Sequence, residues 1–109
     1  MAMIELSKSK GVDVTLANSF WKRFTGLMLK KDIADNQIMC FYPCDGIHTM
    51  FMRFNIDVVY LDGSMNVIGI EKNIGPWSIL RPCRGAVYTL EMKPGLWVFE
   101  LGDKVNWEE

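Results

Sequence analysis

The stretch "NIDVVYLDGSMNVIGIEKN", residues 55–73, constrains the fold more than any other part of the chain. Residues 56–61 and 67–70 are two runs rich in β-branched side chains, which favour strands. Asp62 and Gly63 stand between the two runs, and this pair is typical of the tight turn of a β-hairpin. The sequence therefore predicts two antiparallel strands joined at this turn, within a larger sheet.

Several other stretches predict short strands. Apolar and polar residues alternate in "MIEL" and "VDVTLA", and short apolar runs occur in "QIMCFY", "HTMFMRF" and "AVYTLEM". "LWVFEL" and "DKVNWE" are the expected last strands. Proline and glycine bracket "GPWSILRPCRG", which predicts a loop or an irregular edge segment where a second chain could pair. The oligomeric state stays open.

One stretch, "NSFWKRFTGLMLK", predicts a helix. Phe20, Phe24 and Leu27 recur at the spacing of one helical face, and Asn18 or Ser19 can supply an N-cap oxygen. The expected fold class is therefore mostly β: an antiparallel β sandwich or barrel, jelly-roll-like, with one short α-helix.

Composition limits the broad class of the protein. The chain has 109 residues, of which 50% are hydrophobic and 23% charged, so we expect a single domain over residues 1–109 with a packed core. With 12 Lys+Arg against 13 Asp+Glu there is no basic excess, which argues against nucleic-acid binding. No signal-peptide or membrane-spanning run is seen, so a cytoplasmic protein with no membrane association is expected. The three cysteines are expected to be free thiols.

Four motifs resemble one family of small bacterial and archaeal proteins. They are "RFTGLM" (residues 23–28), "IHTMFMRFNIDVVYLD" (47–62), "YTLEMKPG" (88–95) and "LGD" (101–103), in the family's order. The chain thus resembles domain-of-unknown-function family 192. The resemblance implies a β-rich, jelly-roll-like sandwich with one short helix and brings no established biochemical function.

Cys44 and His48 are the first candidates for catalysis. An imidazole within hydrogen-bond reach could activate the thiol as a nucleophile, and Asp45 or Asp57 could orient the imidazole. Pro43 makes a helix at this spacing unfavourable. The better-known branch of the resembled family has tryptophan opposite His48, so chemistry shared with that branch could not depend on this histidine. The structural interpretation is a loop that leads into a strand.

A metal site is a weaker interpretation of the same region. Cys40, Cys44 and His48, with Met50 or Met52, offer soft ligands for Cu(I) or zinc. Their spacings of four and four do not match the common zinc patterns, so no metal is expected. Phosphate-loop patterns are also missing, and no cofactor is expected.

A dispersed set of polar residues gives the third candidate site: Arg23, Asp57, Glu91 and Asp103, with Arg53 as a second possible cation. A carboxylate on a buried strand must be paired or hydrogen-bonded. Either an arginine satisfies Asp57 and locks the fold, or these groups bind a small polar or anionic ligand.

Two function classes follow from these candidates. The leading hypothesis is a non-catalytic binding or accessory module, with a polar cleft near residues 44–49 and with Arg23, His48, Arg53 and Asp57 as ligand-binding residues. The alternative is a small hydrolase or transferase that uses Cys44 or His48 with a carboxylate. Whether the protein is an enzyme stays open at this point, as does its ligand. The aromatic residues, which could form a sugar- or peptide-binding surface, are interpreted as core.

Overall fold

The computed structural model of the chain describes residues 3–7, 11–17, 33–42, 53–80 and 83–108. These ranges contain the following strands: β1 (Met3–Ser7), β2 (Asp13–Ala17), β3 (Gln37–Phe41), β4 (Ile56–Leu61), β5 (Val67–Ile74), β6 (Tyr88–Met92) and β7 (Lys104–Glu108). The mostly β fold is therefore confirmed. The expected helix and most of the "HTMFMRF" strand lie outside the described residues.

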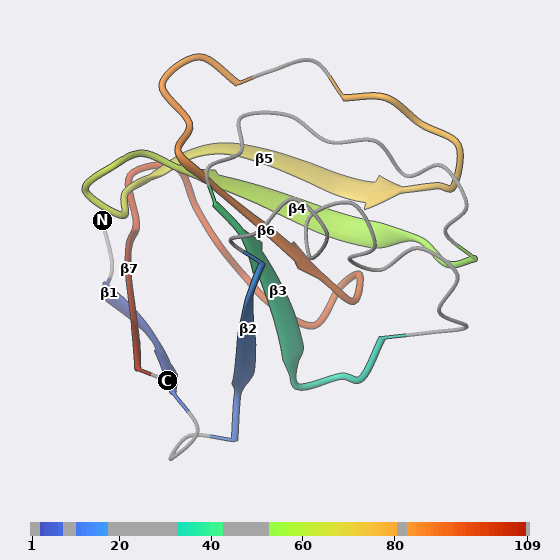
Figure 1. The fold of residues 1–109 in the computed structure, drawn as a ribbon, viewed down its shortest axis with the longest axis horizontal. Coiled ribbons are helices and arrows are strands. Elements are labelled where there is room, and N and C mark those ends of the chain that lie inside the picture. Colours follow the sequence, from blue (N-terminus) through green and yellow to red (C-terminus); the bar gives the residue numbers. More distant parts are fainter. Residues whose placement is uncertain (1–2, 8–10, 18–32, 43–52, 81–82, 109) are drawn as a thin grey trace.

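The described strands form two sheets (Figure 1). The larger has the order β2-β3-β6-β4-β5 and does not close into a barrel, and the smaller pairs β1 with β7. Pairing is antiparallel for β3–β6, β4–β5 and β4–β6. It is parallel for β2–β3 and β1–β7, so the sheets are mixed rather than purely antiparallel. Parallel partners need a long connection, which the chain supplies between β2 and β3.

The predicted hairpin forms as expected between β4 and β5. The Asp62 carboxylate accepts hydrogen bonds from the backbone N–H groups of Ser64 and Asn66, both at 2.9 Å. The amide of Asn66 also donates to this carboxylate at 3.2 Å. These donors, led by the backbone N–H of Asn66, lower the pKa of Asp62. Met65 adopts the left-handed φ of 69° that closes the turn.

The three inner strands of the larger sheet, β3, β6 and β4, are buried on both faces, and β6 shows how the two faces differ. Leu90 and Met92 lie in one apolar cluster with Ile38, Val59 and other residues, on what we call the first face. Thr89 and Glu91 alternate with them and therefore point to the second face. The second face carries the other apolar cluster, which is formed by Ile33, Met39, Phe41, Ile56, Val58 and Tyr60.

The small sheet packs over the first face. Leu6 of β1 and Val105 of β7 belong to the first-face cluster. The start of β7 is also held to the hairpin, because Val67 donates to the Asp103 carbonyl at 2.8 Å and Val105 donates to the Met65 carbonyl at 2.9 Å. The two sheets therefore form a sandwich-like arrangement.

The strand expected over "LWVFEL" is not formed. The chain between β6 and β7 runs back across the sheet without pairing to a neighbour (Figure 1). Phe99 is buried against the first face and Trp97 packs beside it, while Leu96 and Val98 are exposed. Exposed and buried side chains therefore alternate over residues 96–99 as in a strand, but this segment forms no ladder of hydrogen bonds with a described strand. In the described ranges no helix is long and apolar enough to cross a bilayer.

Candidate functional site

The sequence candidates are only partly within the described residues. Arg23, Cys44 and His48 lie outside them, so the proposed cysteine–histidine pair stays a prediction. Arg53 is exposed, whereas Asp57 is buried with 6% of its surface accessible. The surroundings of Asp57 are therefore described. They can be compared with the two expectations for this residue, which are an arginine partner or an open ligand site.

Backbone N–H groups bind the carboxylate of Asp57. Its Oδ1 accepts from Asn73 at 2.8 Å and its Oδ2 accepts from Gly95 at 3.0 Å. Both donors have a left-handed backbone, with φ of 53° at Asn73 and 79° at Gly95. Each oxygen of the carboxylate is therefore hydrogen-bonded to a turn, and these two bonds stabilise the charge inside the fold.

A β-bulge brings Asn73 to this position. Ile56 pairs with Ile74 and Val58 pairs with Glu71. Between these two pairs β5 advances by three residues while β4 advances by two, so β5 contains one extra residue. At the extra residue of a bulge, a backbone N–H points away from the ladder of hydrogen bonds between the two strands. Asp57 lies opposite it and accepts that N–H. The side chain of Asn73 is held as well, because the Asn55 amide donates to its oxygen at 2.9 Å.

Asp103 has a similar structural role. It is 4% exposed, and its carboxylate accepts the backbone N–H of Glu100 at 2.8 Å across the "LGD" turn. Gly102 supplies the left-handed φ of 89° that this turn requires. Two members of the dispersed polar set, Asp57 and Asp103, therefore bind backbone groups of turns. Sequence reasoning missed these partners because it looked for arginines.

Glu91 differs from both of these aspartates. It lies near the middle of β6, the central strand, with Met39 of β3 on one side and Val58 of β4 on the other. Its side chain is 4% exposed, and within the described part of the chain no hydrogen bond or ion pair reaches its carboxyl group. Desolvation raises the pKa of Glu91 from its ordinary value of 4.5 to about 8. Glu91 is therefore mainly a neutral acid at pH 7, able to donate a hydrogen bond.

Other polar side chains share the second face with Glu91. Thr89 lies two residues earlier on β6, and Tyr60 is its direct neighbour on β4. Both are buried. Residues two apart on neighbouring strands lie about 7–8 Å apart on one face, so a carboxyl and two hydroxyl groups gather within an otherwise apolar surface. Asp57 points to the opposite face, so the described residues do not bring Asp57 and Glu91 into one site.

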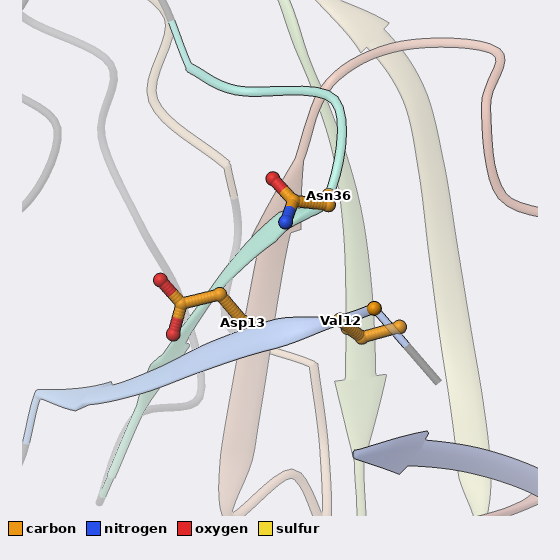
Figure 2. A pocket seen from close by; sticks show the side chains of 4 residues that line it. Val12, Asp13 and Asn36 are labelled. Carbon is orange, nitrogen blue, oxygen red and sulfur yellow. The ribbon is translucent and has the colours of Figure 1, made fainter. Parts of the chain in front are cut away.

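A pocket of about 280 Å³ lies elsewhere, beside the start of β2. It is lined by Gly11, Val12, Asp13 and Asn36. Figure 2 shows that Asp13 and Asn36 extend toward the same side of β2, and both are exposed. None of these four described residues is a cation or a buried polar group, so they give the pocket the chemistry of an ordinary surface.

Thiols and aromatic residues do not build a second site in the described ranges. Cys40 is buried in the first-face cluster, Cys83 is half-buried, and neither is disulfide-bonded. No group of three His, Cys, Asp or Glu side chains suited to a metal ion is found among the residues that the structure describes. Tyr42 stacks on Tyr88 with ring centroids 4.9 Å apart. Trp77 is exposed, contrary to the expectation that the aromatic residues belong to the core.

Comparisons with known proteins agree with one another. The family model DUF192, described as "Uncharacterized ACR", matches residues 3–107. A UPF0127 protein from Thermococcus sibiricus is 34% identical over 115 residues, which cover 94% of this chain and 73% of that protein. A UPF0127 protein from Pyrococcus furiosus is 31% identical, with 96% of this chain and 97% of that protein covered.

A solved structure shows the same fold. The crystal structure of a protein of unknown function from Novosphingobium aromaticivorans matches with a TM-score of 0.68 at 22% identity. The match covers 76% of this chain and 64% of that chain, so the other protein extends well beyond the shared part. At this identity the likeness shows the fold alone.

We predict that Asp57→Asn destabilises the fold. An asparagine offers one oxygen where two N–H donors must be accepted, and its amide would face the N–H of the other donor. The free energy of unfolding should fall by about 2–4 kcal/mol, measured by chemical denaturation. Asp35→Asn is the matched control, because Asp35 is exposed and pairs with Lys93 at the surface, at 3.0 Å. Equal effects of the two substitutions would show that Asp57 does not clamp the two turns.

We also predict that Glu91 makes stability fall as the pH rises. The unfolded carboxyl titrates near 4.5 and the folded one near 8, so between these values the folded state binds more protons. Its contribution is complete below pH 4.5 and is lost as the pH rises through 8, with a slope of at most about 1.4 kcal/mol per pH unit. Denaturation of wild type and Glu91→Gln across this interval measures the slope. Parallel curves for the two proteins would contradict the raised pKa.

Proposed function

The chain belongs to the DUF192 family, and from that premise we propose that it is a binding module for a small polar or anionic molecule, with Glu91 as the central ligand-binding group. The observation that carries the proposal is a buried carboxyl group on the central strand that no described residue pairs. A buried polar group without a partner costs about 1–3 kcal/mol. An apolar residue there would fill the space without this cost, so a glutamate at this place supports a role beyond packing.

The ligand class follows from the state of this carboxyl group. A protonated carboxyl donates a hydrogen bond and carries no charge, so it can meet a carboxylate or phosphate oxygen without repulsion. The surrounding apolar side chains of Met39 and Val58 exclude water, which strengthens such a bond. The hydroxyl groups of Thr89 and Tyr60 on the same face can help to orient a small ligand.

This site replaces part of the arrangement expected from the sequence. Asp57 is engaged by turns on the opposite face, so it is not part of the proposed ligand site. Arg23, His48 and the cleft near residues 44–49 remain sequence-based candidates for additional contacts. A cytoplasmic setting is part of the proposal, because Cys40 and Cys83 are not disulfide-bonded, which is the usual state of cysteines in a reducing compartment.

A second candidate function is acid–base catalysis at the same carboxyl group. A group whose pKa lies near the working pH exchanges protons well, and the value of about 8 for Glu91 favours this role. Such an enzyme would lose turnover in Glu91→Gln, whereas a binding module keeps its ligand because glutamine also donates a hydrogen bond. The hydrolase or transferase that uses Cys44 or His48 remains a prediction from the sequence.

Thermal-shift measurements test the binding role. We expect inorganic phosphate or a small monocarboxylate such as acetate to raise the melting temperature of wild type near neutral pH, because a ligand that binds only the folded state stabilises it. The shift should persist in Glu91→Gln and vanish in Glu91→Met, which removes the donor while keeping the side chain's length. Glu71→Met is the matched control, since Glu71 is exposed on β5.

Two outcomes would count against this function. One is that neither anion raises the melting temperature of wild type. The other is that Glu91→Met responds to the anions as wild type does, which would place binding elsewhere. A neutral sugar serves as the comparison probe, because a shift with the sugar alone would exclude the anionic ligand class.

A further inference from the structure

The second face of the larger sheet becomes more accessible to solvent beyond Glu91. Along β6, Thr89 is 0% exposed and Glu91 is 4% exposed, whereas the side chain of Lys93, just after the strand, is 35% exposed. The neighbouring strand β3 changes in the same direction, from buried Met39 to half-buried Gln37. Glu91 therefore lies between a closed end of this face and an end at Gln37 and Lys93, which we call the open end.

Lys93 belongs to the same face as Glu91. Side chains alternate between the two faces along β6, and Lys93 follows Glu91 by two residues. The alternation continues past the last residue of β6 because Lys93 precedes Pro94, and the residue before a proline favours an extended conformation. Two steps along a strand cover about 6.6 Å. A long, flexible side chain with an ammonium group is therefore attached next to the buried carboxyl group.

Gln37 adds a second polar side chain at the open end. β3 and β6 are antiparallel and pair Met39 with Glu91, so the same register two residues further places Gln37 beside Lys93. The side chain of Gln37 extends along the second face, because its Nε2 donates to the sulfur of Met39 at 3.8 Å. An ammonium group and an amide group therefore lie at the open end of the face that holds the Glu91 carboxyl group.

The ammonium group of Lys93 pairs with the carboxylate of Asp35, with 3.0 Å between Nζ and Oδ1. Asp35 lies in the turn before β3, and its side chain is 74% exposed. Ion pairs at this exposure contribute little to stability, because both charges remain hydrated. Lysine also has a flexible stem with rotatable donors. Lys93 can therefore exchange the carboxylate of Asp35 for an anionic group of a ligand at a small cost.

We propose that Lys93 gives the Glu91 site its preference for anions, and that the ligand is a carboxylate or phosphate that enters at the open end. One oxygen of the ligand accepts from the Glu91 carboxyl group and another accepts from the Lys93 ammonium group. This inference rests on the binding function proposed above and adds to it the residue that selects the charge of the ligand.

A second group is needed because Glu91 alone does not select an anion. A neutral carboxyl group donates a hydrogen bond equally to a charged oxygen and to the oxygen of an amide or a sugar. An ammonium group favours the charged oxygen, because a hydrogen bond between two ionised groups is stronger than one between neutral groups. The apolar neighbours of Glu91 add to this preference by excluding water. Asp35, by the same argument, competes with the ligand for Lys93.

Titration of the full chain with acetate, followed by thermal shift near neutral pH and at constant ionic strength, tests the role of Lys93. Lys93→Met should raise the dissociation constant for acetate by about tenfold or more, because the charged donor is lost. Lys93→Arg keeps the charge and should bind acetate nearly as wild type does. Lys72→Met is the matched control, because Lys72 is exposed on β5, two strands away from β6. Circular dichroism verifies that each variant is folded.

Asp35→Asn should change the affinity in the opposite direction. Loss of the competing carboxylate should lower the dissociation constant for acetate by about threefold. A lysine that only stabilised the fold through this ion pair would give no such gain. Acetamide, the neutral analogue of acetate, separates charge from shape. Wild type should bind acetate more tightly than acetamide, and Lys93→Met should lose this difference.

The possible failures of the two proposals can be distinguished. If acetate stabilises wild type and Lys93→Met binds it equally well, the role of Lys93 is overturned while binding at Glu91 stands. The role of Lys93 is also overturned if Lys72→Met weakens acetate binding as much as Lys93→Met does, or if Asp35→Asn weakens it. If acetate does not stabilise wild type at all, the binding function itself is contradicted, and the role of Lys93 with it.

Discussion

The carboxylate of Asp57 ties together parts of the chain that are far apart in sequence. One oxygen accepts the N–H of Asn73 at the end of β5, and the other accepts the N–H of Gly95 after β6. The first bond stabilises the bulge of the hairpin, and the second fixes the point where the chain turns back over the first face. Residues 96–101 start from this turn on their path toward β7. A charge that first suggested a ligand site is thus an organising element of the fold.

Glu91 is also a buried carboxyl group, but its surroundings differ from those of Asp57. Asp57 is stabilised by two N–H donors, whereas no described residue pairs with Glu91, and desolvation raises its pKa to about 8. The two side chains point to opposite faces of the larger sheet. The first face is therefore closed by small-sheet packing and turns, while the second face has a neutral acid at its centre. This difference separates the structural carboxyl group from the one that we propose binds a ligand.

Much of the fold could be predicted from the sequence, because the signals are local. The turn at Asp62 and Gly63 and the runs that form β3, β4 and β6 depend on residue type and alternation over a few positions. The parallel pairings could not be predicted in this way, since they join segments distant in the chain. "LWVFEL" alternates like a strand yet finds no neighbour. The partners of Asp57 were missed because Asn73 and Gly95 approach it only in the folded chain. For Glu91, the sequence showed a charge in an apolar strand, but its central position required the order of strands in the sheet.

The proposed role of Glu91 depends on the protonation state of its carboxyl group inside the folded protein. Carbon-13 NMR of the side-chain carboxyl group follows this state directly, with Glu91→Gln identifying the resonance. We expect a titration midpoint near pH 8. A midpoint near the ordinary value of 4.5 would contradict it, because Glu91 would then be charged at neutral pH and stabilised by partners or solvent.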